Sequence, residues 1–345
     1  MIQFQCDYTE GAHESILKRL TETNYEQTIG YGCDDYCEEA RNTIRRVFGV
    51  PDAGVHFLVG GTQANATVIA AALKPYQGVI CASTGHIFVH ETGAIEATSH
   101  KVLAMPTSMG KITAAQVSDY CRAHYANSDR EHEVQPGMVY ISLPTELGTL
   151  YTKAELEALY QVCEEFHMYL FVDGARLGYG LMASDCDITP EFLAAHCDVF
   201  YAGGTKMGAL FGEAVVITNK TLNQDFRYMI KHNGGMIAKG RLGGVMFLAA
   251  LEHDDYFAWA RHANEMADII RAGMERAGIP FFQRTTTNQI FAVLTEKQNA
   301  ALALDFAYER WATLDDGRVA VRFVTSWATT AEDCRKLVSA LEAMA

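Results

Sequence analysis

Short apolar runs rich in β-branched and aromatic residues alternate with amphipathic stretches along the first two thirds of the chain. Such runs are typical of strands buried on both faces, and the longer stretches between them are typical of helices. Thr152, followed three residues later by Glu155, has the spacing of a capping box and predicts a helix start. The pattern predicts strands over residues 55–59, 78–81, 101–105, 138–143, 169–172, 199–201 and 214–218, and helices over 64–73, 114–124 and 153–167.

This alternation predicts an α/β fold with a mostly parallel sheet of seven strands, covered by helices on both faces. After about residue 250 the pattern changes. It predicts a long helix over 254–277, short strands near 288–294 and 318–325, and a terminal helix from Thr330. We therefore expect a large domain over residues 1–245 and a smaller α+β domain over 246–345.

Composition places the chain among ordinary globular proteins. Its 345 residues exceed what one core usually serves, and 49% of them are hydrophobic against 20% charged. The net charge of −14 disfavours nucleic acid or an anionic membrane as a partner. The chain has no apolar run near the length of a membrane span, no signal-peptide pattern, and nine cysteines without a framework spacing. We expect a cytoplasmic protein with reduced thiols.

One glycine-rich segment, residues 201–208, carries Lys206, and Asp173 ends an earlier predicted strand. A lysine amine can form a Schiff base with the aldehyde of pyridoxal phosphate (PLP), and a carboxylate keeps the cofactor's pyridine nitrogen protonated. Since ligands of parallel sheets bind beyond the carboxyl ends of the strands, Asp173, Lys206 and Glu146, which follows the strand at 138–143, are expected to converge. The alternative is that Lys206 is a solvated loop residue.

The segment Gly60-Gly61-Thr62 follows a predicted strand and opens a predicted helix. Glycines allow the backbone to approach an anion, and the free amides of a helix N-terminus point toward it, so Gly61 and Thr62 are candidates to bind a phosphate. A tight turn without a ligand is the alternative. The chain lacks a G-x-G-x-x-G motif here, which gives a dinucleotide site little support.

His86, His90 and Glu91 lie within six residues of one another. The sequence supplies no obvious third metal ligand beside the two histidines, so we expect no metal site here. Stacking of His86 on a flat cofactor ring is the functional interpretation, and a hydrogen-bonded buried histidine is the alternative.

The order of these motifs resembles the threonine aldolase family of PLP enzymes over nearly the whole chain, and most closely its phenylserine aldolase and low-specificity branch. The resemblance implies the aspartate aminotransferase-like fold, known as PLP fold type I. It also implies cleavage of a β-hydroxy-α-amino acid of the threonine, allo-threonine or phenylserine type to glycine and an aldehyde. β-Elimination, racemisation or non-catalytic PLP binding are the alternatives. The motifs that carry the family resemblance are Tyr31-Gly32, Gly60 to Asn65, His86-Ile87-Phe88, Asp173 to Leu177, Lys206 and Arg322 to Thr325.

The resemblance also implies roles for single residues. Lys206 would link the cofactor, Asp173 would pair with its ring nitrogen, and His86 would stack on the ring. The resemblance further implies a homo-oligomer, a dimer or a tetramer, with shared active sites. Gly61 and Thr62 would contact the phosphate, and Arg176 and Arg322 would bind the substrate carboxylate, with Arg176 also contacting the cofactor. Cys6, which with Asp7 occupies the place of the family's Ser-Asp, would contact the substrate. Tyr31 and Lys231 would approach a neighbouring subunit's site, Tyr31 at the substrate and Lys231 at the cofactor.

Two positions depart from the commoner pattern of this family. Glu146 stands where most members have a histidine, so we expect Glu146 to be the base for the β-hydroxyl proton, either directly or through a water or His90. Ile237 stands where they have an arginine, and Lys239 and Arg241 are near enough in sequence to replace that charge.

Overall fold

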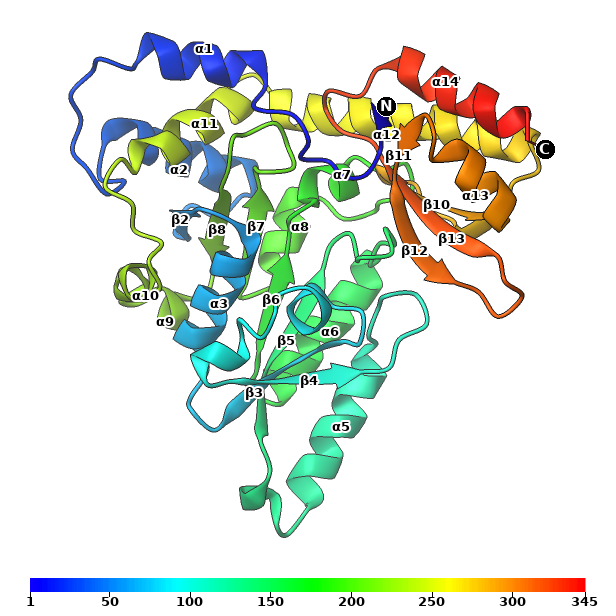
Figure 1. Ribbon diagram of the computed structural model, residues 1–345. Helices are drawn as coiled ribbons and strands as arrows, with labels where there is room; N and C mark the ends of the chain where they lie inside the picture. Colours follow the sequence, from blue (N-terminus) through cyan, green and yellow to red (C-terminus); the bar gives the residue numbers. More distant parts are fainter. Residues whose placement is uncertain (345) are drawn as a thin grey trace.

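The computed structural model describes residues 1–344 and contains one large sheet (Figure 1). All seven strands predicted for this sheet form, so the prediction of a mostly parallel seven-stranded sheet is confirmed. Strand β8 is the exception, since it runs antiparallel to both of its neighbours. The order across the sheet is β2 (Gly54–Leu58), β8 (Glu213–Ile217), β7 (Val199–Gly203), β6 (Tyr169–Asp173), β5 (Gln135–Ser142), β3 (Gln77–Ala82) and β4 (Lys101–Met105).

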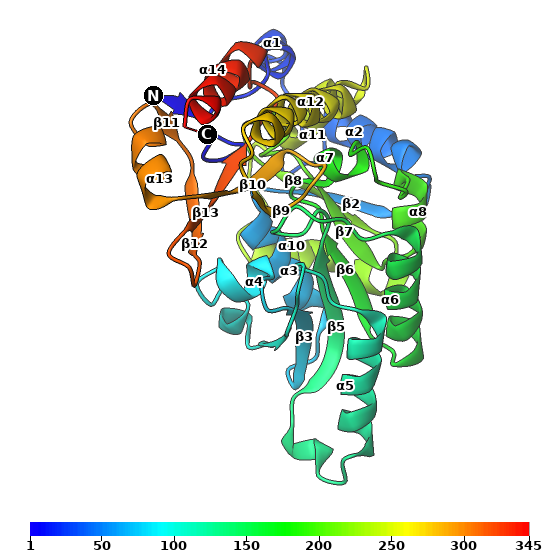
Figure 2. The same cartoon turned by 90° about the vertical axis from the view of Figure 1, so that its right-hand side faces the viewer.

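Two apolar cores sandwich this sheet, because alternate residues of its strands point to opposite faces. In β5, Val139 packs into one core and Met138 and Tyr140 into the other. Figure 2 shows the sheet between the two layers of helices. The first core includes residues of α1 (Glu14–Glu22), α2 (Asp35–Val47), α5 (Ala114–Ala126), α6 (Lys153–Glu165), α7 (Leu177–Leu181), α8 (Pro190–Ala195) and α11 (Arg241–Leu251). The second core includes residues of α3 (Gly61–Ala72), α4 (His86–Val89), α9 (Lys220–Asn223) and α10 (Phe226–His232).

Local signals set several helix ends. The Thr152 side chain accepts from the Glu155 amide while the Glu155 side chain accepts from the Thr152 amide, which confirms the capping box at the start of α6. Helix α3 begins at Gly61, three residues before the predicted start. Helices α11 and α12 (Asp255–Arg276) are separated by Asp254, whose φ of 63° cannot continue a right-handed helix.

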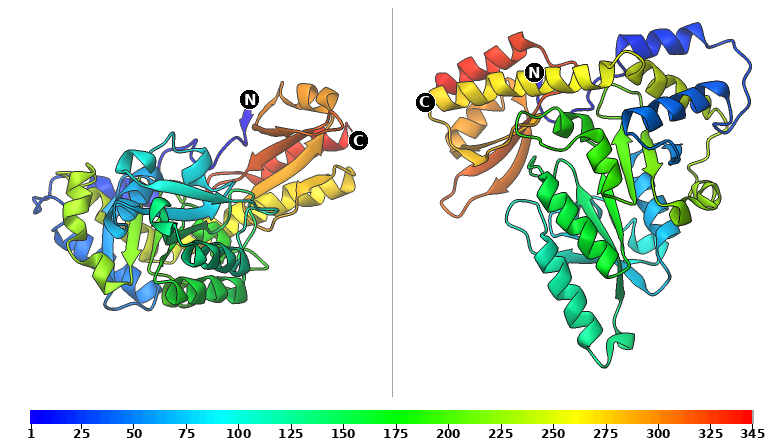
Figure 3. Two further views of the ribbon diagram at one scale, coloured as in Figure 1. Left: turned by 90° about the horizontal axis from the view of Figure 1, so that it is seen from below. Right: turned by 180° about the vertical axis from the view of Figure 1, so that it is seen from behind.

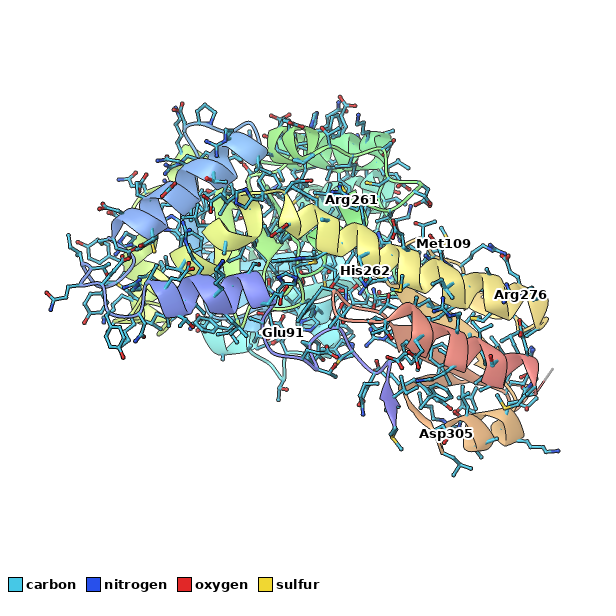
Figure 4. The ribbon with its side chains drawn as sticks, turned by 90° about the horizontal axis from the view of Figure 1, so that it is seen from above. Glu91, Met109, Arg261, His262, Arg276 and Asp305 are labelled. Atoms are coloured by element: carbon cyan, nitrogen blue, oxygen red, sulfur yellow. The ribbon has the colours of Figure 1, made fainter. Side chains whose placement is uncertain are left out.

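A smaller antiparallel sheet packs against α12 and α14 (Ala331–Glu342). Figure 3 shows α12 running from the large sheet to this smaller one, and Figure 4 shows α12 beside α14, with Arg276, which pairs with Glu342 at 2.9 Å, near its C-terminal end. Two further elements of this region are α13 (Glu296–Leu302) and the parallel pair of β1 (Ile2–Gln3) with β11 (Phe306–Ala307). The sheet order is β12 (Glu309–Thr313), β13 (Val319–Val324), β10 (Gln289–Leu294) and β9 (Phe281–Gln283).

The predicted domain boundary at residues 245 and 246 falls inside α11, which packs against α1 and α2. The first residues of the chain join the C-terminal region, because β1 pairs with β11 and Phe4 lies in the core of the smaller sheet. The division into two domains therefore stays a prediction. Among residues 1–344, no helix combines the length and apolar character that a membrane span requires.

Candidate active site

Residues from the carboxyl ends of the parallel strands line a cavity of about 310 Å³. A second cavity of about 590 Å³ lies between this one and the smaller sheet, and both are lined by Tyr8, His86, Glu146, Arg176 and Lys206. The structure thus brings together most of the residues that the sequence predicts for the site. The first cavity also contains Gly61, Thr62 and Asp173, and the second Cys6 and Arg322.

Asp173, the last residue of β6, is only 5% exposed. Its carboxylate accepts hydrogen bonds from the Ala175 amide at 3.0 Å, from Asn65 Nδ2 at 3.2 Å and from the Tyr140 hydroxyl. Burial raises the pKa of Asp173, whereas the charge of His86 and the hydrogen bonds from tyrosine hydroxyls lower it. The lowering effects together exceed the effect of burial, so the pKa lies below its usual value. A carboxylate whose pKa lies below its usual value is ionised at neutral pH and fits a protonated pyridine nitrogen. Tyr140 was not predicted as a site residue, because it lies within an apolar strand.

Lys206 lies in the turn between β7 and β8. The Gly204 and Thr205 amides donate to the Gly212 carbonyl at 2.9 and 3.1 Å, which closes this turn. The Lys206 amine is 5.9 Å from the centre of the Tyr8 ring. Burial and the charge of Arg176 lower the pKa of Lys206, which favours the neutral amine that a covalent link to an aldehyde requires.

Glu213 is a buried carboxyl beside Lys206 that the sequence interpretation missed. It accepts hydrogen bonds from the Gly204 amide at 3.3 Å and from the Thr205 hydroxyl at 3.1 Å, both in the turn that carries Lys206. Burial raises the pKa of Glu213 to about 8, against the opposing charge of Lys206. Glu213 could have been identified from the sequence, because it is a glutamate at the start of an otherwise apolar strand and buried carboxyls are rare without a partner.

His86 begins α4 and belongs to a hydrogen-bonded chain that reaches Asp173. Its Nδ1 lies 2.7 Å from Glu91 Oε1, and Asn65 Nδ2 donates to the same Glu91 oxygen at 2.7 Å as well as to Asp173. Burial lowers the pKa of His86, but the bond to Glu91 and the charge of Asp173 raise it above its usual value. Within residues 1–344, no group of three or more His, Cys, Asp or Glu side chains is arranged to hold a metal ion.

Glu146 lies just after β5 and faces both cavities. Its Oε1 accepts hydrogen bonds from the His86 amide at 2.9 Å and from the Ser142 hydroxyl at 2.6 Å. Burial raises the pKa of Glu146. Raising the pKa of a carboxyl toward neutrality makes it a stronger base, so the position and the environment of Glu146 suit proton transfer.

The N-terminus of α3 opens onto the first cavity through Gly60, Gly61 and Thr62. No side chain caps this terminus, and a Cβ at Gly60 would meet no atom within 4 Å. Free helix amides beside open space form a site that fits a phosphate. Together with Lys206 and Asp173, this helix terminus gives the cavity the groups that PLP requires.

Both candidate carboxylate-binding arginines have carboxylate partners in this chain. Arg176 Nε and one terminal nitrogen donate to the two oxygens of Asp7 at 2.7 and 3.0 Å. Arg322 donates to Gln289 Oε1 at 2.8 Å and to Glu309. Glu309 was not among the residues predicted to act in the site.

Tyr31 and Lys231 lie outside the cavities that contain Lys206. The Lys231 amine is 5.2 Å from the centre of the Tyr31 ring, and Tyr31 lines a separate cavity with Arg41, Phe57 and Arg227. Arg241, expected to replace a family arginine, instead donates to the carbonyls of Glu26 and Thr23 at 2.9 and 2.8 Å. Within one chain, the structure does not bring these side chains to the site.

Comparisons with known proteins agree with this geometry. Residues 3–297 match the family model described as beta-eliminating lyase. The chain is 30% identical to a low specificity L-threonine aldolase of Pseudomonas aeruginosa over 97% of this chain and 95% of that protein. It is also similar to the solved structure of a threonine aldolase from Leishmania major, with 40% identity, a TM-score of 0.97 and coverage of 100% and 99% of the two chains. An aspartate aminotransferase from Thermus thermophilus, with 16% identity, a TM-score of 0.72 and coverage of 100% and 96%, shares the fold.

Proposed function

The chain belongs to the beta-eliminating lyase family, and we propose from this premise that it is a PLP-dependent aldolase of the threonine aldolase type. Its substrate is a β-hydroxy-α-amino acid, which it cleaves to glycine and an aldehyde. Similarity to threonine aldolases over nearly the full chain supports this reaction. One observation carries the proposal: two neighbouring cavities are lined by Lys206, Asp173, Glu146, Arg176 and Arg322.

The residues around the first cavity fit PLP. Lys206 would hold it covalently, Asp173 would pair with its ring nitrogen, and His86 would contact its ring. Gly61 and Thr62, with the first amides of α3, would bind its phosphate. When bound, PLP accepts the electrons released as a bond to the substrate Cα breaks.

The side chains around the second cavity suit the substrate. Arg176 and Arg322 supply guanidinium groups for its carboxylate, and holding that group restricts the orientation of the bond to be broken. Cys6 lines the same cavity. Glu146 removes the proton of the β-hydroxyl group. Because Glu146 Oε1 already accepts two hydrogen bonds, Oε2 is the oxygen that takes this proton.

An assay of aldehyde release tests this function. The substrates are L-threonine, L-allo-threonine, both phenylserine diastereomers and the D-enantiomers. We expect aldehyde and glycine in equal amounts from at least one of them, and only with PLP present. Release of ammonia and an oxo acid would instead indicate β-elimination, and inverted substrate without cleavage would indicate racemisation. Binding of PLP without turnover of any substrate would indicate a non-catalytic protein.

We also propose a cytoplasmic homo-oligomer, a dimer or a tetramer, in which active sites are shared. Tyr31 and Lys231 support this arrangement, since they lie beside each other but outside the cavity of their own chain. Tyr25 and Ile29, on the loop that precedes Tyr31, are 94% and 72% exposed, so this loop presents apolar side chains that suit contact with a second subunit.

A further inference from the structure

The two arginines of the second cavity differ in how firmly the chain holds their carboxylate partners. Asp7 is fully buried, binds Arg176 through both oxygens, and accepts a third hydrogen bond from Asn288 at 2.9 Å. The Glu309 side chain is 36% exposed, and Arg322 is its single side-chain partner within residues 1–344. Asp7 is therefore a fixed partner, whereas Glu309 is free to leave.

Arg322 remains fixed when Glu309 moves. One of its terminal nitrogens donates to Gln289 Oε1 at 2.8 Å, and its guanidinium lies 5.1 Å from the centre of the Trp311 ring. Gln289 itself is fully buried. The Nε of Arg322 is buried without a hydrogen-bond partner. Other side chains thus hold the arginine, and Glu309 mainly neutralises its charge.

The register of the smaller sheet places Glu309 at the cavity. Glu309 on β12 pairs directly with Arg322 on β13, so both side chains lie on the same face of the sheet. Glu309 and Arg322 line the cavity together with Arg176 and Lys206. A substrate carboxylate that binds Arg322 therefore competes with Glu309 for the same guanidinium group.

We propose that Glu309 is a specificity-determining residue, a displaceable counter-ion of Arg322 that competes with the substrate carboxylate and disfavours substrates with a second carboxylate. This inference rests on the proposed aldolase function. After displacement, Glu309 remains in the same cavity as an unpaired negative charge. It tolerates a neutral β-substituent and repels an anionic one.

The test compares Glu309→Gln with the wild-type protein. The substrates are a neutral β-hydroxy amino acid that the protein cleaves and β-hydroxyaspartate, which carries a second carboxylate. We expect the variant to lower KM for the neutral substrate by about two- to fivefold, the range that corresponds to the energy of a solvent-accessible ion pair. We expect a larger decrease for β-hydroxyaspartate, while kcat for the neutral substrate changes by less than about twofold. Glu296→Gln removes the partner of Arg310, which is also on β12 but is solvent-exposed and outside the cavity, and should change neither value.

Calorimetric binding of butyrate and succinate, which differ by one carboxylate, separates this inference from the proposed function. Glu309→Gln in the PLP-loaded protein should bind both more tightly, and succinate should gain more. If the protein cleaves no β-hydroxy amino acid but these affinities change as expected, the function fails and the counter-ion role stands. Unchanged KM values and affinities in an active variant would overturn the counter-ion role, as would a lower kcat at constant KM.

Discussion

At the scale of single residues, burial acts on four titratable groups of the site with different results. Asp173 keeps a pKa below its usual value because His86 and the tyrosine hydroxyls outweigh burial. Glu146 and Glu213 have raised pKa values because burial dominates, and Lys206 has a lowered one. Groups whose environments separate their pKa values in this way are suited to different acid and base roles.

Lys206→Ala should abolish turnover and the covalent link to PLP, since no other lysine lines either cavity within residues 1–344. Borohydride reduction of the wild-type protein with PLP, followed by peptide mapping, should locate the pyridoxyl group on Lys206. Lys220→Ala, on the surface helix α9, serves as the control and should keep both properties. Labelling of a different lysine would refute the assignment of the whole site.

Glu146→Gln tests the base. Glutamine preserves the size of the side chain and accepts the hydrogen bonds of Ser142 and His86, but it cannot take a proton. Because a positioned general base contributes typically about 10²- to 10⁴-fold, turnover should decrease by about that factor while the absorbance of bound PLP is unchanged. A decrease below about threefold, with the same pH dependence as the wild type, would mean that another group takes the proton.

Glu213→Gln should change how stability depends on pH. The unfolded chain releases the proton of Glu213 near pH 4.5, whereas burial in the folded chain delays its release to about pH 8. Between these values the folded state binds more protons, so Glu213 makes stability fall as pH rises. In PLP-free protein, urea unfolding between pH 5 and 8 should therefore show a smaller decline for Glu213→Gln. Glu265→Gln, an exposed substitution on α12, should retain the wild-type slope, and an identical slope in the Glu213 variant would contradict the buried proton.

At the scale of elements, the strands that carry the site were predictable because they are buried on both faces and therefore read as apolar runs. The helices α1, α2 and α10 were not predicted. Helices α1 and α2 carry charged residues on much of their surface, with few buried positions each, so their apolar signal is sparse. Strand β12, which positions Glu309, has no fully buried residue and gives no such signal.

The ends of β6 and β7 approach so closely that only glycine fits between them. A Cβ at Gly174 would lie 1.9 Å from the Tyr201 carbonyl oxygen, and one at Gly203 would lie 2.4 Å from the Ala175 oxygen. Gly174→Ala should therefore separate the two strands beside Asp173, with a loss of about 1–3 kcal/mol or more in the free energy of unfolding and weaker PLP binding. Urea unfolding and PLP titration measure both effects.

Gly11→Ala is the matched control for this substitution, because a Cβ at Gly11 would meet no atom within 4 Å. Its unfolding and PLP binding should equal those of the wild type. Equal stability of Gly174→Ala and Gly11→Ala would show that the strand ends separate without cost.

At the scale of the whole molecule, the sequence located the residues that follow strands but not their partners. Asp173, Lys206 and Glu146 could be placed together because the carboxyl ends of parallel strands meet at one edge of a sheet. The pairing of Asp7 with Arg176 joins residues 169 positions apart through the path of the N-terminal segment. Neither composition nor periodicity encodes such a contact.

The positions of Tyr31 and Lys231 also belong to the scale of the assembly. If these side chains complete the site of a neighbouring subunit, Lys206→Ala and Lys231→Ala each abolish activity but damage different parts of a shared site. Mixed in equal amounts under conditions of subunit exchange, they should recover about a quarter of the wild-type activity, because half of random dimers are hybrids and each hybrid retains one intact site. A mixture of Lys206→Ala and Glu146→Gln provides the control. Both residues line the same cavity of one chain, so each site of a hybrid dimer contains one of the two defects. Sedimentation that shows a fully active monomer, or no recovery in mixtures that demonstrably exchange subunits, would exclude shared sites.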